Sequence, residues 1–125
     1  MKISRIITPL LLLVPLAACS APTATEDPAC AEVPPATVTT ILDGTSGPPL
    51  KAQKSAAVQS ADSSNWFIAI EFTHDTGTDV GVWQSNALEG GPIGSVDAFA
   101  KSYTNWPDTG NAGSGAQSAA ENCLR

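Results

Sequence analysis

Apolar positions alternate with polar ones along the middle of the chain, a period of two that is typical of β-strands with one buried face. The clearest stretch is 66–72 (Trp-Phe-Ile-Ala-Ile-Glu-Phe). Weaker stretches at 56–61, 80–85 and 93–96 are separated from it and from one another by polar or glycine-rich turns. Short consecutive strands joined by turns predict an antiparallel meander of three to four strands.

Helical spacing replaces this alternation on both sides of the strands. Residues 36–42 follow a proline pair, carry apolar side chains three and four apart, and precede Gly44, which predicts a short helix. A second helix is predicted over 97–103, and a third over the alanine-rich run 116–124 behind Ser114 as its cap. Helices at both ends with strands between predict one α+β domain, in which the helices cover one face of the sheet.

The N-terminus follows a different pattern. An apolar run at 6–16 lies behind two basic residues and ends in small residues before Cys19, the layout of a bacterial secretory signal. The run holds two prolines and is shorter than the roughly 20 residues that a membrane span needs. Leu-Ala-Ala-Cys at 16–19 resembles the lipobox of bacterial lipoproteins. We therefore expect a signal peptide at 1–18 and a lipid anchor on Cys19, whose diacylglycerol and palmitate chains give stable membrane attachment.

Composition divides the remaining 107 residues into a tether and a domain. Residues 19–29 are small, polar and spaced by prolines, so after the lipidated cysteine they form a flexible tether. Residues 30–125 are long enough for a single domain. Without the signal peptide the chain keeps four basic and twelve acidic residues, a net charge of −8. This charge repels phosphate backbones, so we expect no nucleic-acid partner.

Cysteine usage agrees with an exported protein. With Cys19 taken by lipid, Cys30 and Cys123 remain as an even pair near the two ends of the domain. We interpret them as a disulfide, which would join the two terminal helices and is worth about 4–5 kcal/mol in the chain-entropy model. The alternatives are a metal pair or two free thiols. Two cysteines without a nearby histidine supply only half of a zinc site.

Few residues suggest catalysis. The single histidine, His74, is followed by Asp75 in a predicted loop, and the chain has no Gly-x-Ser-x-Gly motif, so a solvated histidine is the favoured interpretation. Asp75 and Asp79 flank Gly77 but lack the pattern of a calcium-binding EF-hand loop. The glycine cluster at 90–94 resembles no phosphate-binding loop. We therefore expect no catalytic residue, no metal and no cofactor.

Aromatic residues are the best candidates for binding, because tryptophan and tyrosine are enriched where proteins recognise partners. A small domain also needs large side chains for its core, and we assign Trp66 and Trp83 to it. Trp106 lies in a loop between Asn105 and Pro107, so it is the better candidate for a surface contact, with Tyr103 beside it as a second possible binding residue.

Several short motifs occur together with a closing cysteine: Cys30-x-x-Val33-Pro34, Trp66-Phe67-Ile68-Ala69, Gly81-Val82-Trp83 before Ser85-Asn86, and Val96-Asp97-x-x-Ala100 before Trp106. The ensemble resembles small, uncharacterised lipoproteins of actinobacteria, which implies the extracellular face of a Gram-positive membrane and carries over no activity. We expect a non-catalytic binding or interaction domain with an extracellular protein or glycan as partner. The alternatives are a small secreted hydrolase, or hydrolase accessory, that uses His74, and an inhibitor or phage-exclusion lipoprotein.

Overall fold

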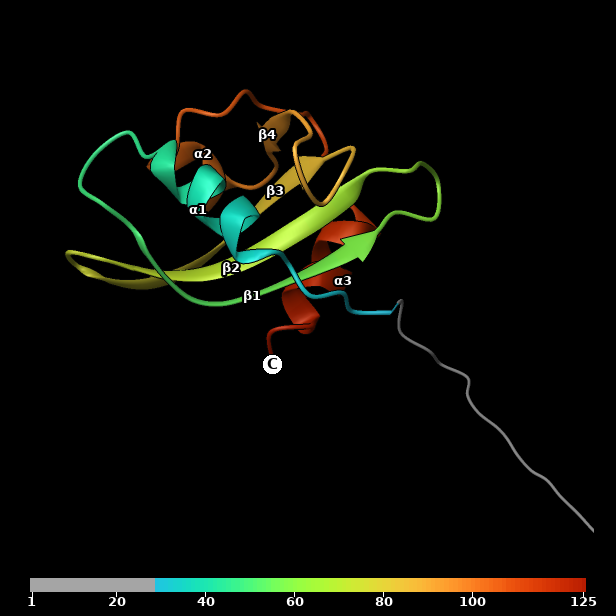
Figure 1. Ribbon diagram of the computed structural model, residues 1–125, viewed down its shortest axis with the longest axis horizontal. Coiled ribbons are helices and arrows are strands. Elements are labelled where there is room, and N and C mark those ends of the chain that lie inside the picture. The colour runs from blue at the N-terminus through green and yellow to red at the C-terminus, as the bar shows by residue number, and fades with distance from the viewer. Residues whose placement is uncertain (1–28) are drawn as a thin grey trace, which may run out of the picture.

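The computed structural model describes residues 29–125, which fold into one sheet and three helices (Figure 1). The elements follow in the order α1 (Pro35–Asp43), β1 (Lys51–Gln59), β2 (Trp66–His74), β3 (Gly77–Ser85), β4 (Ile93–Ser95), α2 (Ala98–Tyr103) and α3 (Gly115–Asn122). The four strands pair antiparallel in the order β1-β2-β3-β4, the meander that the alternation predicts. The predicted α+β class, with a small antiparallel sheet and helices at both ends, is therefore confirmed.

Strand β1 is longer than its hydrophobic pattern indicates. It begins at Lys51 rather than at Ala56, and its first four residues are exposed although they lie beside the C-terminal half of β2. Period-two alternation reports which side chains are buried, so a strand segment without burial leaves no such pattern. At the same end of β2, only Asp75 and Thr76 separate the pair His74–Gly77, which makes a tight hairpin with β3 where the sequence predicts a longer loop.

Helices cover both faces of the sheet, and the prediction that they cover one face was wrong. In Figure 1, α1 and α2 lie above the sheet and α3 lies below it. The even-numbered side chains of β2, including Ile68 and Phe72, pack with Trp83 against α1 and α2. The odd-numbered Phe67 and Ala69 pack against α3. Because β2 is apolar on both faces, each face needs a covering layer.

Local sequence explains where each helix begins. α1 starts with Pro35 in its first turn, where the missing N–H costs nothing. The Asp97 carboxylate caps α2 by accepting from the Ala100 N–H at 2.9 Å. The Ser114 hydroxyl caps α3 by accepting from the Gln117 N–H at 3.1 Å. These caps satisfy backbone donors that a helix leaves unpaired at its start.

The predicted disulfide is confirmed: Cys30 and Cys123 are bonded, with their Cα atoms 5.9 Å apart. The bridge connects the end of α3 to the segment that pairs with the edge of β1, where Ala31 and Ala57 exchange two backbone hydrogen bonds. It does not place α3 beside α1, because these helices lie on opposite faces of the sheet.

The predicted signal peptide at 1–18, the lipid anchor on Cys19 and all but the last residue of the tether 19–29 lie outside the described residues. Within residues 29–125, no helix has the length and apolar character needed to cross a membrane.

Candidate functional site

His74 ends β2 and is packed, so the expectation of a solvated loop histidine was wrong. Its side chain is only 7 % exposed. The ring Nδ1 lies 3.3 Å from the Thr76 backbone nitrogen and 3.0 Å from the Thr76 hydroxyl, while Nε2 lies 2.7 Å from Asp79 Oδ2. Because the Thr76 N–H can only donate, Nδ1 is the acceptor, and the hydrogen-bond network assigns the proton to Nε2, which donates to Asp79.

Tyr103 covers the other side of this ring. The two rings stack with centroids 4.7 Å apart, and the tyrosine hydroxyl lies 3.3 Å from His74 Nε2. Tyr103 also meets Phe72 edge to face at 5.3 Å. A general base needs a lone pair directed at its substrate. The lone pair on Nδ1 accepts from the hairpin's own N–H, and the ring stacks on Tyr103, so His74 connects the hairpin to α2.

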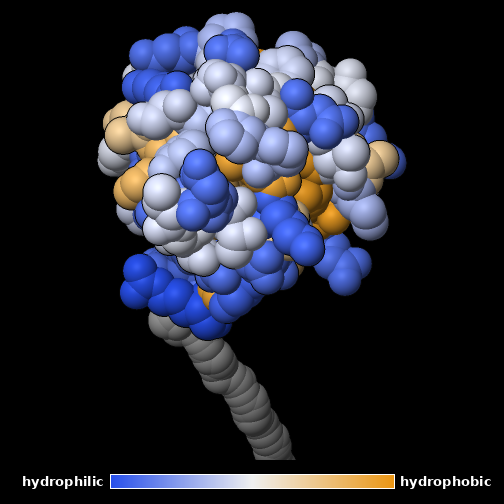
Figure 2. All heavy atoms as spheres, turned by 90° about the vertical axis from the view of Figure 1, so that its left-hand side faces the viewer, coloured by the Kyte–Doolittle hydropathy of each residue, from blue (hydrophilic) through white to orange (hydrophobic). Residues whose placement is uncertain are grey.

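A hollow of about 210 Å³ lies beside Tyr103, between the hairpin and the loop at 45–50. Figure 2 faces this end of the molecule and shows hydrophobic residues, in orange, between hydrophilic residues in blue and residues of intermediate hydropathy in white. Asp75 and His74 both line the hollow. Within the described part of the chain, no three or more histidine, cysteine and acidic side chains gather in a metal-binding arrangement.

Trp106 is partly buried and bound to the protein. Its indole N–H donates to the Ile41 carbonyl at 2.8 Å, and the ring packs against the core on the α1 and α2 side. Gly44 allows this contact, because a Cβ at that position would come within 2.4 Å of the indole nitrogen. These contacts argue against Trp106 as the main binding residue. Trp83 is fully buried, as predicted, and Trp66 packs partly buried against the same core.

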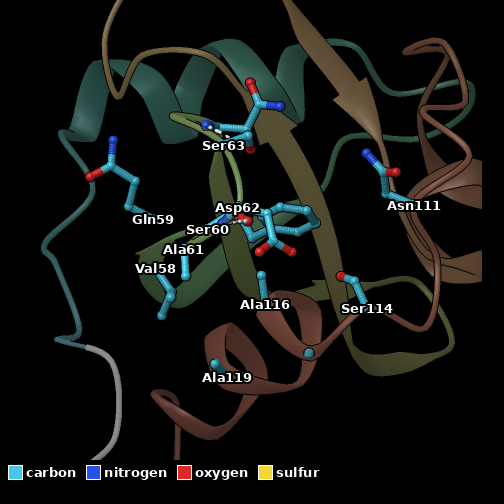
Figure 3. A pocket seen from close by; sticks show the side chains of 13 residues that line it. Val58, Gln59, Ser60, Ala61, Asp62, Ser63, Asn111, Ser114, Ala116 and Ala119 are labelled. Carbon is cyan, nitrogen blue, oxygen red and sulfur yellow. Dashed lines mark hydrogen bonds between the residues drawn. The ribbon is translucent and has the colours of Figure 1, made fainter.

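A hollow lies between the β1–β2 turn and α3, and we call it the α3 groove (Figure 3). Its volume is about 470 Å³. Apolar side chains from the two strands and the helix line it: Val58, Phe67, Ala116 and Ala119. Polar side chains from the turn and from the loop before α3 line it as well: Gln59, Ser60, Asp62, Ser63, Asn65, Asn111 and Ser114.

The polar side chains of the α3 groove retain hydrogen-bonding capacity. The Ser63 hydroxyl accepts from the Asn65 N–H at 3.3 Å, which leaves its own proton free to donate. Asn111 donates to Gln84 at 2.7 Å and keeps its carbonyl oxygen as an acceptor. Among the described residues that line the groove, Asp62 is the only charged one. Such an arrangement suits binding through hydrogen bonds and apolar contact, the usual character of a ligand site.

Sequence reasoning missed the α3 groove because its walls come from segments about 50 residues apart in the chain. The individual signals are turn residues and alanines, which carry no functional meaning alone. The chain matches no protein-family model, no curated protein and no solved structure. Its function is therefore argued from the geometry of the residues.

Proposed function

We propose that this protein is a membrane-anchored, non-catalytic binding domain on the extracellular face of a bacterial cell, held there by lipid on Cys19. The observation that carries the binding role is the α3 groove, whose apolar surface and largely neutral polar surface resemble those of ligand-binding clefts. The compact disulfide-linked fold supports an extracellular location, because disulfides persist in oxidising compartments.

The arrangement around His74 supports binding over hydrolysis. The hydrolase alternative uses that ring as its base, but Nδ1 accepts from Thr76 and Nε2 donates to Asp79. No observation favours the inhibitor or phage-exclusion alternative over a general binding domain.

Site-specific photo-cross-linking on intact cells tests the proposal. A photoreactive phenylalanine analogue in place of Ser63, on the exposed turn that lines the α3 groove, is expected to give a discrete cross-linked adduct. The matched control replaces Thr39, an exposed residue of α1 on the opposite face of the sheet, and is expected to give none. Equal labelling from both positions, or no adduct from Ser63, contradicts a binding role for the groove.

A second variant separates binding from hydrolysis. His74→Gln introduces an amide whose NH₂ group can donate to Asp79 in place of Nε2, but it has no imidazole for proton transfer. We expect the variant to fold and to retain the Ser63 cross-link. If the folded variant loses the biological effect of the protein, the hydrolase alternative is favoured instead.

A further inference from the structure

A second hollow lies on the other side of α3. The only large hydrophobic side chain that is exposed among the described residues, Phe99 of α2, lines it and is 44 % exposed. Val80 of β3 and Gln117 and Glu121 of α3 line it as well, and its volume is about 460 Å³. We call it the Phe99 hollow. An exposed aromatic side chain beside a hollow is a feature of interaction sites.

Two carboxylates face this hollow without a cation to neutralise them. Asp97 is 8 % exposed, and its Oδ1 accepts from the N–H groups of Val82 at 3.1 Å and Ala100 at 2.9 Å. Burial raises the pKa of Asp97, and the negative charge of Glu121 raises it further. Among the described residues, Lys54 pairs with Glu71 and Lys101 with Asp108, and neither of these two carboxylates forms an ion pair.

The α3 groove and the Phe99 hollow lie on either side of the start of α3. Asn111 and Ser114 line the groove, whereas Ala112 and Gly113 between them line the hollow. Along the helix, Ala116 and Ala119 face the groove while Gln117 and Glu121 face the hollow. One extended polypeptide can therefore contact both.

We propose that the Phe99 hollow takes the lysine or arginine side chain of a polypeptide partner whose neighbouring residues lie in the α3 groove. The aliphatic stem packs on Phe99 and Val80, and the cationic head lies near the carboxylates of Asp97 and Glu121. Charge complementarity and a cation–π contact with Phe99 favour this occupant over a neutral glycan. The inference rests on the proposed binding function and specifies its partner.

Nuclear magnetic resonance titration of the full chain in detergent micelles tests the inference with two peptides. The first is the acetylated and amidated peptide Ser-Ala-Arg-Ala-Ser, and the second replaces arginine by citrulline, which has nearly the same shape without the charge. We expect the arginine peptide to shift the amides of Val82 and Ala100 saturably, because both amides bond to Asp97. The citrulline peptide is expected to bind at least fivefold more weakly.

Variants locate the effect. Glu121→Gln keeps the hydrogen bond from Gln117 and removes the charge. It is expected to weaken binding of the arginine peptide at least threefold and to leave binding of the citrulline peptide unchanged. Phe99→Ala is expected to weaken the arginine peptide as well. Glu89→Gln removes one exposed acid from the β3–β4 loop and serves as the matched control without effect.

Three outcomes overturn the inference. Equal affinity of the two peptides, with shifts confined to Ala116 and Ala119, leaves the groove as a binding site without a cation preference. Arginine amide alone binding as tightly as the pentapeptide assigns the hollow to small amines. If no amide resonance at the Phe99 hollow shifts, the hollow is not a binding site. The proposed function is tested separately by the Ser63 cross-link.

Discussion

Replacing both bridged cysteines, Cys30→Ser with Cys123→Ser, should lower the free energy of unfolding substantially. The bridge spans 93 positions, nearly the whole described domain. A cross-link of that length lowers the entropy of the unfolded chain, which adds about 4–5 kcal/mol to the free energy of unfolding in the chain-entropy model. Removal of a native disulfide from a small secreted domain lowers the free energy of unfolding by about 2–5 kcal/mol. The folded contacts around it should persist, because the Ala31–Ala57 hydrogen bonds and the packing of Leu124 do not involve the sulfurs.

Urea denaturation followed by tryptophan fluorescence measures this loss, because Trp83 is fully buried in the folded state. With a slope of about 1–3 kcal/mol per molar urea, a loss of about 2–5 kcal/mol lowers the midpoint by about 0.7–5 M. The parent chain reduced with dithiothreitol should match the double variant. A midpoint change below about 0.5 M, or two alkylatable thiols in protein from its native compartment, would refute the reasoning.

Three further predictions concern single side chains. Trp106→Phe should cost about 0.5–1.5 kcal/mol because it removes the indole hydrogen bond to the Ile41 carbonyl, which then accepts only from the Gly44 N–H. Trp106→Ala should cost about 2–4 kcal/mol because it also leaves a cavity. Weaker partner capture without loss of stability would restore Trp106 as a surface contact. Asp97→Asn should raise the free energy of unfolding relative to the parent at pH 7, because the raised pKa of Asp97 means that its ionised form destabilises the folded state. The difference in stability should shrink as the pH falls towards 3.8, where the parent carboxyl becomes protonated. A difference in urea midpoint between variant and parent that stays constant from pH 7 to pH 4 contradicts this prediction. Cys19→Ala should release the protein from membranes or leave it as uncleaved precursor, and unchanged membrane fractionation would sink the lipid-anchor prediction.

Much of the fold follows from local patterns. The alternation in 66–72 identifies a strand, the Gly44 and Ser114 signals bound helices, and the even cysteine pair indicates a bridge. These features depend on spacing within a few residues or on the number of cysteines, so a single sequence carries them. The lipid anchor on Cys19 has the same kind of signal and stays a prediction.

Other features depend on what lies opposite a residue in space. Phe99 recurs at helical spacing with buried neighbours, yet its helix is short and its side chain meets a hollow. His74 reads as a loop residue until the tight hairpin and Tyr103 close around it. The two-sided covering of the sheet follows from the apolar residues at 67 and 69, whose partner is an alanine-rich helix some 50 residues away. Periodicity does not encode such distant pairings.

The sheet separates two core clusters that differ in the size of their buried side chains, and this difference affects how readily each layer opens. The α1 and α2 side buries two large aromatic side chains, Trp83 and Phe72, whereas the α3 side buries one, Phe67, among alanines, valines and Leu124. Less apolar area is lost when α3 lifts away, so this layer should open at a lower free energy than the rest and exchange its amide hydrogens first. The Cys30–Cys123 disulfide limits how far the end of α3 can move away during this opening. A ligand that contacts both sides of α3 should therefore slow the exchange of amide hydrogens in this layer.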